Sequence, residues 1–273
     1  MAPTVGIVSP GAMGSALADA LDTRVLATLE GRSERTRRLA ARAQRLELLP
    51  TLDDVLREAD VVLSVVPPGE AEGIGAAVRS AGADLLFVDL NAVSPETVCR
   101  IGADVDGAIS GPPPWRSETT RIYLSGSRAA EVASLPWTRL ELIVVGEEVG
   151  TASAVKMCTA SVYKGTTALL AHALLTARSA GVLEHVLDDL RSSFPELVDD
   201  AGTTVARATT KSARYVPEME EIAATQATAG LPQELFEGIA AAYDALSKRD
   251  LARTAPEDVP AGLSVSDALD RLG

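Results

Sequence analysis

A glycine-containing turn follows the first apolar segment of the chain. Residues 5–8 lead into the turn at residues 9–14, and the residues after it have a helical pattern. In a turn that joins a strand to a helix, Gly11 lets the backbone approach a pyrophosphate and Gly14 lets the helix pack on the strand. The N–H groups and the dipole of the helix N-terminus favour the phosphate charge. The pattern predicts a dinucleotide site made by Ser9, Gly11, Ala12, Met13 and Gly14, with Ser9 where a first glycine usually stands. A strand–turn–helix that binds nothing is the alternative.

The residues after the second predicted strand, 25–29, indicate which dinucleotide binds. A chain that binds NAD carries Asp or Glu about twenty residues after the glycine turn, to bond the ribose 2′-OH. Here Arg32 and Ser33 stand near that position, which suits a 2′-phosphate and predicts NADP. Two alternatives remain, namely that Arg32 is a solvated arginine of a basic helix and that Glu30 binds the ribose.

Lys156 lies in the first turns of a long predicted helix, close to a predicted domain boundary. At 100° per residue Tyr163 shares its face, and Lys164 lies roughly 80° round the helix. A lysine ammonium can donate a proton to an alkoxide as it forms, and a tyrosine can orient the substrate or share the donation. Cationic or apolar surroundings lower a lysine pKa, which makes it a usable acid near neutral pH. We therefore predict Lys156 and Tyr163 as catalytic residues and Lys164 as a substrate ligand; a lysine that only extends from the helix between domains is the alternative.

Two further segments are candidates for lining a pocket. Trp115 follows three prolines at residues 112–114, a stiff loop that can present an aromatic wall to substrate. Lys211 and Arg214 can clamp a carboxylate or a phosphate. The alternatives are a tryptophan packed in a surface loop and a solvated basic turn balanced by acids such as Glu218.

The elements that must position these residues alternate in the first half of the chain. Short apolar runs alternate with helical patterns, as a doubly wound sheet requires. The run at residues 61–66 is unbroken, which is typical of a buried parallel strand, and Pro67 ends it. The remaining strands are predicted at residues 85–88, 108–110, 122–125 and 140–145.

The pattern changes after Gly146, where strand signals cease and helices follow. The first helix is predicted over residues 151–180, and Pro195, Pro217 and Pro232 are predicted to open later ones. The sequence thus predicts two domains, residues 1–147 and 148–273. The fold class is α/β, with an N-terminal Rossmann domain that has a doubly wound, mostly parallel sheet, and an all-α C-terminal domain.

Composition narrows the classes of partner. The chain has 273 residues, 47% of them hydrophobic, which is enough for a core in each of two domains. A net charge of −13 argues against nucleic acid and against an anionic membrane surface. Two cysteines make no disulfide framework, which predicts a cytoplasmic protein. Two histidines, His172 and His185, exclude a His-rich metal site, so we predict no metal.

Three motifs together resemble the β-hydroxyacid dehydrogenase superfamily. They are residues 6–14, residues 107–111 (Gly-Ala-Ile-Ser-Gly) and residues 150–156 (Gly-Thr-Ala-Ser-Ala-Val-Lys), in matching order and spacing. The superfamily includes 3-hydroxyisobutyrate and 6-phosphogluconate dehydrogenases and, more distantly, imine reductases. The chain is most similar to a 6-phosphogluconate-dehydrogenase-like subgroup with a short helical C-terminal domain of unknown function.

The resemblance implies roles for individual residues. It implies that Val66, Pro67 and Asn91 flank the nicotinamide half of NADP, and that Ser110 and Gly111 hold a substrate carboxylate through a hydroxyl and a backbone N–H. It also implies that Lys156 is the acid/base, and that the protein is a homodimer with interlocked long helices and C-terminal domains.

Two positions depart from the pattern of the hydroxyacid enzymes. Those enzymes have Asn four residues after the catalytic Lys, where this chain has Ala160, and a second Gly after the Ser-Gly pair, where it has Pro112. Both changes affect substrate choice and leave the cofactor motif and Lys156 intact. We therefore expect an NADP-dependent oxidoreductase that acts on a small polar carbonyl or hydroxy substrate, such as a hydroxy acid. An imine reductase and a non-catalytic NADP-binding protein are the alternatives.

Overall fold

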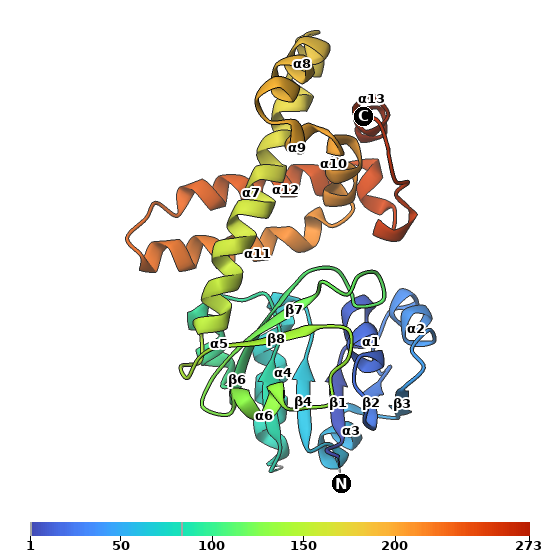
Figure 1. Ribbon diagram of the computed structural model, residues 1–273, viewed down its shortest axis with the longest axis vertical. Coiled ribbons are helices and arrows are strands. Elements are labelled where there is room, and N and C mark those ends of the chain that lie inside the picture. Colours follow the sequence, from blue (N-terminus) through green and yellow to red (C-terminus); the bar gives the residue numbers. More distant parts are fainter. Residues whose placement is uncertain (1, 83) are drawn as a thin grey trace. The chain divides into compact units, whose positions relative to one another are not determined.

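The computed structural model describes residues 2–82 and 84–273, and the chain folds into two compact units (Figure 1). The first unit is Met1–Met157 and the second is Cys158–Gly273. The sequence places the boundary at 147/148, ten residues earlier. The difference arises because the first two turns of the long helix α7 (Thr151–Ser179) are held by hydrogen bonds to the sheet of the first unit.

The first unit is built on one eight-stranded sheet with the strand order β3-β2-β1-β4-β5-β6-β7-β8. Strands β1 to β6 are parallel, β7 is antiparallel to β6, and β8 runs parallel to β7. The mostly parallel, doubly wound sheet is therefore confirmed. The strands are β1 (Val5–Val8), β2 (Val25–Thr28), β3 (Leu46–Leu49), β4 (Val61–Ser64), β5 (Leu86–Asp89), β6 (Val105–Ser110), β7 (Arg121–Ser125) and β8 (Glu141–Gly146).

Strand β3 is the one that the sequence does not predict. It is the edge strand beside β2, and none of its four residues is buried. Because an edge strand has a neighbour on one side only and is partly solvated, it needs no unbroken apolar run. The apolar pattern that identifies central strands is therefore missing from its sequence.

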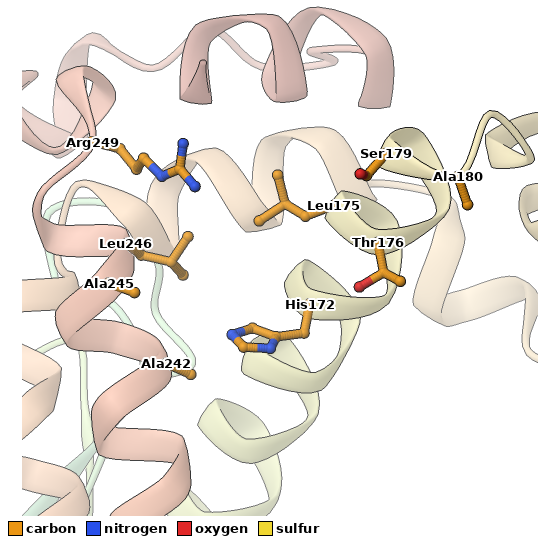
Figure 2. Close-up of a pocket in the computed structure, with 9 residues that line it drawn as sticks. All are labelled: His172, Leu175, Thr176, Ser179, Ala180, Ala242, Ala245, Leu246 and Arg249. Atoms are coloured by element: carbon orange, nitrogen blue, oxygen red, sulfur yellow. The ribbon is translucent and has the colours of Figure 1, made fainter.

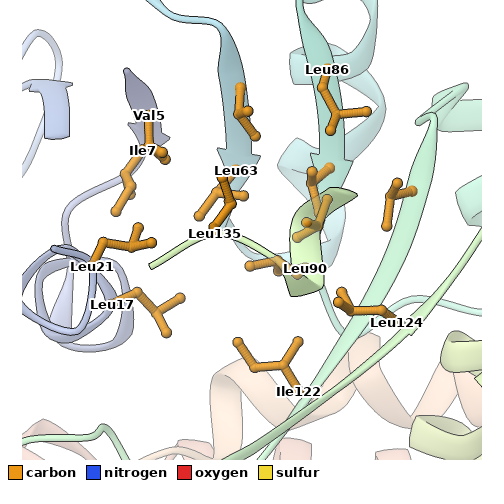
Figure 3. Packing of buried hydrophobic residues seen from close by; sticks show 14 of the residues in the cluster. Val5, Ile7, Leu17, Leu21, Leu63, Leu86, Leu90, Ile122, Leu124 and Leu135 are labelled. Carbon is orange, nitrogen blue, oxygen red and sulfur yellow. The ribbon is translucent and has the colours of Figure 1, made fainter. Parts of the chain in front are cut away.

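The core of the first unit lies on both faces of the sheet. Ile7 belongs to one buried cluster and the next residue, Val8, to the other, as expected for a strand whose successive side chains point to opposite faces. Figure 3 shows the first cluster, in which Leu17 and Leu21 pack near Ile7. The helices of this unit are α1 (Ala12–Asp19), α2 (Glu34–Ala40), α3 (Leu52–Glu58), α4 (Pro68–Ala81), α5 (Pro95–Ile101) and α6 (Ala129–Ala133).

The second unit is all-α in the residues from 158 onward, apart from turns and two short 3-10 helices, as predicted. After α7 the helices are α8 (Leu183–Ser193), α9 (Pro195–Val198), α10 (Ala201–Thr209), α11 (Ser212–Thr228), α12 (Glu234–Ser247) and α13 (Val265–Leu272). The prediction that Pro217 opens a helix is wrong, because α11 begins five residues earlier and contains this proline. Pro217 is the sixth residue of α11, beyond the first turn, so the helix continues past it with one intrahelical hydrogen bond missing.

The close packing of α1 against the glycine turn gives a first testable prediction. A Cβ added at Gly14 would clash with the Ser9 carbonyl oxygen, whereas a Cβ added at Gly11 would meet nothing within 4 Å. Gly14→Ala therefore has to shift the turn, and we expect it to lower the free energy of unfolding by about 1–3 kcal/mol. Gly11→Ala is the matched control, with an expected change within about 0.5 kcal/mol. Chemical denaturation measures both, and equal stabilities would contradict the close packing.

Candidate functional site

The glycine turn presents the N-terminus of α1 without a side-chain cap within the described part of the chain. Ser9 has a φ of +72°, the left-handed conformation that glycine adopts most easily. The Gly11 N–H donates to the Ser9 carbonyl at 2.8 Å, and the Ser15 hydroxyl donates to the Pro10 carbonyl at 2.6 Å. Because the space beside Gly11 is open, the first N–H groups of α1 can receive an anion. The residues present fit the pyrophosphate of a dinucleotide.

Arg32 follows β2 and has an unsatisfied donor. Its Nε is buried and has no hydrogen-bond partner among the described residues, while its Nη1 lies 3.2 Å from Glu70 Oε2. A buried donor without a partner is costly, and a phosphate oxygen would satisfy it. Ser33 accepts from the Thr36 N–H at 3.2 Å as the N-cap of α2. The carboxylate of Glu30 accepts from the Leu52 N–H at 3.4 Å, at the first residue of α3.

Asn91 is buried, and its amide group holds the segment that follows β4. Its Oδ1 accepts from the Val66 N–H at 2.6 Å, and its Nδ2 donates to the Ser64 hydroxyl at 2.9 Å and to Asp89. Val66 immediately precedes Pro67, the N-cap of α4. The side chain of Asn91 therefore bonds to the protein itself and fixes the backbone that the family resemblance assigns to the nicotinamide half.

A pair of buried carboxylates lies beneath this edge of the sheet. Asp89 of β5 and Asp106 of β6 are register partners on neighbouring parallel strands, and both are fully buried. The pKa of Asp89 is raised to about 7, mainly by burial and to a lesser extent by the charge of Asp106. At neutral pH Asp89 is therefore partly protonated.

Asp106 anchors the helix that carries Lys156. Its Oδ2 accepts from the backbone N–H groups of Gly150 at 3.0 Å and Ser153 at 2.8 Å, and its Oδ1 accepts from the Ser153 hydroxyl at 2.7 Å. The Ser125 hydroxyl donates to Oδ2 at 3.1 Å and accepts from the Ala152 N–H at 3.0 Å. A carboxylate at a helix N-terminus satisfies N–H groups that have no partner in the helix and favours the helix dipole. This cluster fixes the start of α7 against β6 and β7.

The anchor brings Lys156 to the end of β6. Its Nζ donates to the Ile109 carbonyl at 2.7 Å, and the next two residues are Ser110 and Gly111. Gly111 has a φ of +118°, which lets the chain turn out of the sheet there. The structure thus brings together an ammonium, the hydroxyl-bearing Ser110 and Gly111, all within the first unit. Ala160, one turn further along α7, is buried.

Tyr163 lies in the second unit, and so do the predicted cationic ligands Lys164 and Arg214. Tyr163 is 71% exposed. Lys164 forms an ion pair with the buried Glu218, and Arg214 lies 3.4 Å from the other oxygen of the same carboxylate. The Lys164 ammonium lies 4.5 Å from the centre of the Tyr215 ring. Both cations therefore neutralise a buried acid in this structure, and their role as substrate ligands stays a prediction.

Trp115 has packing contacts within the first unit. Its indole N–H donates to Asp19 at 3.0 Å near the end of α1, and the Arg42 guanidinium lies 5.3 Å from the ring centre. These contacts tie the loop between β6 and β7 to α1. They match the alternative of a packed tryptophan, and the substrate contact of Trp115 stays a prediction.

A separate groove of about 500 Å³ lies in the second unit between α7 and α12 (Figure 2). Its polar groups include the His172 imidazole and the Arg249 guanidinium, which donates to the Gly273 carbonyl at 2.8 Å. No predicted site residue lines it. The lining residues are His172, Leu175, Thr176, Ser179, Ala180, Ala242, Ala245, Leu246 and Arg249.

The sequence analysis missed two acids that hold the site together, Asp89 and Asp106. Asp89 and Asp106 stand inside apolar strands, where an acid is unusual, and that contrast was the available signal. Within the described ranges, 2–82 and 84–273, no group of three or more His, Cys, Asp or Glu side chains is arranged to bind a metal ion. Over the same residues, we find no helix with the length and apolar character that crossing a bilayer requires.

Comparison with known proteins places this geometry in a family. A family described as a domain of unknown function, DUF1932, matches residues 177–246. A conserved protein of unknown function, described as structurally similar to 3-hydroxyacid dehydrogenases, is 31% identical, with a TM-score of 0.65. The match covers 89% of this chain and 96% of that one.

Two enzyme groups share the fold at lower identity. The 3-hydroxyisobutyrate dehydrogenase of Mycobacterium tuberculosis, in a structure with L-serine, is 18% identical over 100% of this chain and 99% of its own, with a TM-score of 0.66. An imine reductase variant from Myxococcus stipitatus in complex with NAD⁺ is 20% identical over 100% of both chains, with a TM-score of 0.53.

The chain combines an N-terminal Rossmann-like domain, with a mostly parallel sheet, and a helical C-terminal region. The chain belongs to the β-hydroxyacid dehydrogenase family, which includes 3-hydroxyisobutyrate dehydrogenase-like proteins, and DUF1932 is the C-terminal helical domain of this family.

The carboxylate anchor gives a second testable prediction. Asp106→Asn keeps one acceptor oxygen and replaces the other by an NH₂ group, so the negative charge and at least one of the bonds from Gly150, Ser125 and Ser153 are lost, and we expect the free energy of unfolding to fall by about 2–4 kcal/mol. Asp104→Asn is the matched control, because that exposed residue accepts one bond, from the Phe87 N–H at 2.8 Å. Chemical denaturation compares the two variants. If the two variants lose similar amounts of unfolding free energy, the hydrogen bonds of Asp106 do not stabilise the protein more than that of Asp104.

The raised pKa of Asp89 gives a third testable prediction, on pH dependence. Its pKa is about 7 in the folded protein and 3.8 ordinarily, so the folded state binds more protons between these values. The free energy of unfolding therefore loses a few kcal/mol from this group as pH rises from about 4 to 7. Asp89→Asn removes that loss, so its stability relative to the wild type should rise from pH 5 to pH 8. Parallel pH profiles for the two proteins, measured by denaturation, would show that Asp89 titrates normally.

Proposed function

We propose that this protein is an NADP-dependent oxidoreductase that acts on a small polar carbonyl or hydroxy substrate, such as a hydroxy acid. The observation that carries the proposal is the position of the Lys156 ammonium, 2.7 Å from the Ile109 carbonyl and beside Ser110 and Gly111. Family membership supports the reaction class. The orphaned Arg32 Nε supports a ligand with a 2′-phosphate.

The chemistry is divided between the cofactor and the chain. NADPH, when bound, supplies the hydride that reduces a carbonyl carbon. Lys156 supplies the proton to the carbonyl oxygen, and its bond to the Ile109 carbonyl holds the ammonium in place for that transfer. The Ser110 hydroxyl and the Gly111 N–H bind the substrate carboxylate, which orients the reacting carbon. Tyr163 is proposed to share in orienting the substrate.

An imine reductase is the second candidate, and the residue at position 160 favours it. Hydroxyacid enzymes have a polar Asn there, whereas Ala160 of this chain is apolar and buried. Solved imine reductases also share the fold. Turnover of a panel of cyclic imines against a panel of aldehydes and keto acids separates the two. NADPH binding without turnover of either panel would favour a non-catalytic NADP-binding protein.

We further propose a homodimer formed through α7. Two large apolar side chains of this helix are strongly exposed, with exposed fractions of 64% for Val162 and 71% for Leu169. Residues 162 and 169 are seven apart and therefore lie on one face of the helix. A second copy of the chain can cover this apolar stripe, and light scattering of the purified protein measures the expected dimer mass.

The role of Lys156 gives a fourth testable prediction. Lys156→Met keeps the apolar stem and removes the ammonium, so we expect turnover to fall by about 10²–10⁴-fold while NADPH binding changes little. Lys248→Met, at an exposed lysine paired with Asp244, is the matched control and should keep full turnover. Steady-state kinetics and a fluorescence titration with NADPH measure the two quantities. Near-normal turnover of Lys156→Met would refute its role as the acid.

Cofactor preference gives a fifth testable prediction. Arg32→Ala removes the guanidinium proposed to bind the 2′-phosphate, so the dissociation constant for NADPH should rise about tenfold or more while that for NADH is little changed. Titration of both cofactors into the wild type and the variant measures the ratio. Equal affinity of the wild type for NADPH and NADH would defeat the proposed preference.

A further inference from the structure

An ion pair joins the loop after β2 to the first turn of α4. Arg32 Nη1 lies 3.2 Å from Glu70 Oε2, and the two side chains are 21% and 53% exposed. Both partners follow strands at the carboxyl edge of the sheet, β2 for Arg32 and β4 for Glu70, and these strands lie on either side of β1. The glycine turn begins at the end of β1, so the pair brackets the place where the adenosine end of a dinucleotide binds in this type of sheet.

The contacts of Arg32 show that its guanidinium is only partly satisfied by Glu70. The pair uses Nη1, while the buried Nε has no hydrogen-bond partner among the residues that the structure describes. An arginine whose fork is fully used by one carboxylate would present two parallel N–H groups to it. Here Glu70 engages one edge, and a further acceptor is needed for Nε.

We propose that Glu70 is a specificity-determining residue that competes with a 2′-phosphate for Arg32. In the free protein its carboxylate holds the guanidinium. A 2′-phosphate must share or take over that contact, and it carries about −1.5 to −2 charge that the carboxylate repels. A ribose with a free 2′-OH does not meet this penalty, because a hydroxyl can donate to a carboxylate. Glu70 thus lowers the preference for the phosphate-bearing dinucleotide that Arg32 creates.

This inference rests on the proposed use of NADP, but it concerns a residue that the proposed chemistry does not use. Glu72 lies two residues after Glu70 in the same helix and is therefore a suitable control for it. It pairs with Arg100 at 3.0 Å, and its side chain is 56% exposed. Its removal changes the net charge of α4 as much as removal of Glu70 does, without a contact to Arg32.

The test measures binding of two adenosine fragments by calorimetry at low salt. Adenosine 2′,5′-bisphosphate carries the 2′-phosphate and adenosine 5′-monophosphate lacks it, and neither can react. We expect Glu70→Gln to raise the affinity for the bisphosphate about three- to tenfold, with no gain for the monophosphate. Glu72→Gln should change the ratio of the two affinities less than twofold. The gain should shrink as salt is raised, because it is electrostatic in origin.

The outcomes separate this inference from the proposed function. An unchanged or lower ratio in Glu70→Gln overturns the competition, and so does an equal gain in Glu72→Gln, which would be a charge effect of the whole helix. Arg32→Ala is the reference variant. If it lowers the bisphosphate affinity while Glu70→Gln leaves the ratio unchanged, only the role of Glu70 fails. If Arg32→Ala leaves the ratio unchanged, the proposed 2′-phosphate site itself fails.

Discussion

The carboxylate of Asp106 is the contact on which the arrangement of the candidate site depends. It is buried in β6 and accepts from the N–H groups of Gly150, just before α7, and of Ser153 in its first turn, together with the hydroxyls of Ser125 and Ser153. A buried carboxylate is tolerated only when such donors compensate for its lost hydration, so its position and that of the helix start are determined together. Because β6 also ends in Ser110, the same strand fixes both the helix that carries Lys156 and the residues beside its ammonium.

At the cofactor end of the site, by contrast, the backbone N–H groups at the start of α1 are not capped by any side chain of the described residues. The turn at Ser9 adopts a left-handed conformation, Gly14 lets α1 approach it closely, and no side chain among the described residues caps the helix. Stability here comes from packing of α1 on the strand, while the N–H groups stay available for an anion. The segment after β4 is held by a side chain instead, because the amide oxygen of Asn91 accepts from the Val66 N–H.

The second unit shows how polar residues can be structural rather than functional. Glu218 is buried in α11, and a carboxylate at such a depth requires a cation. Lys164 supplies it and lies over the Tyr215 ring, whose edge-to-face partner Tyr243 donates to the Lys164 carbonyl at 2.7 Å. This network ties α7, α11 and α12 together. It also explains why a lysine at helical spacing from Lys156 need not belong to the same chemistry.

The sequence by itself determined the sheet type, the glycine turn, the extent of α7 and the family, because each is a local pattern of apolar period, glycine position or motif spacing. It did not reveal the edge strand β3, whose partial solvation removes the apolar signal, nor the start of α11 before Pro217. Only the tertiary structure decided what each polar side chain touches. Glu70 reaches Arg32 from a different βα unit, and Asp106 reaches α7 across more than forty residues of chain. Such pairings follow from strand order in the sheet, which brings distant segments together and leaves no periodic trace in the sequence.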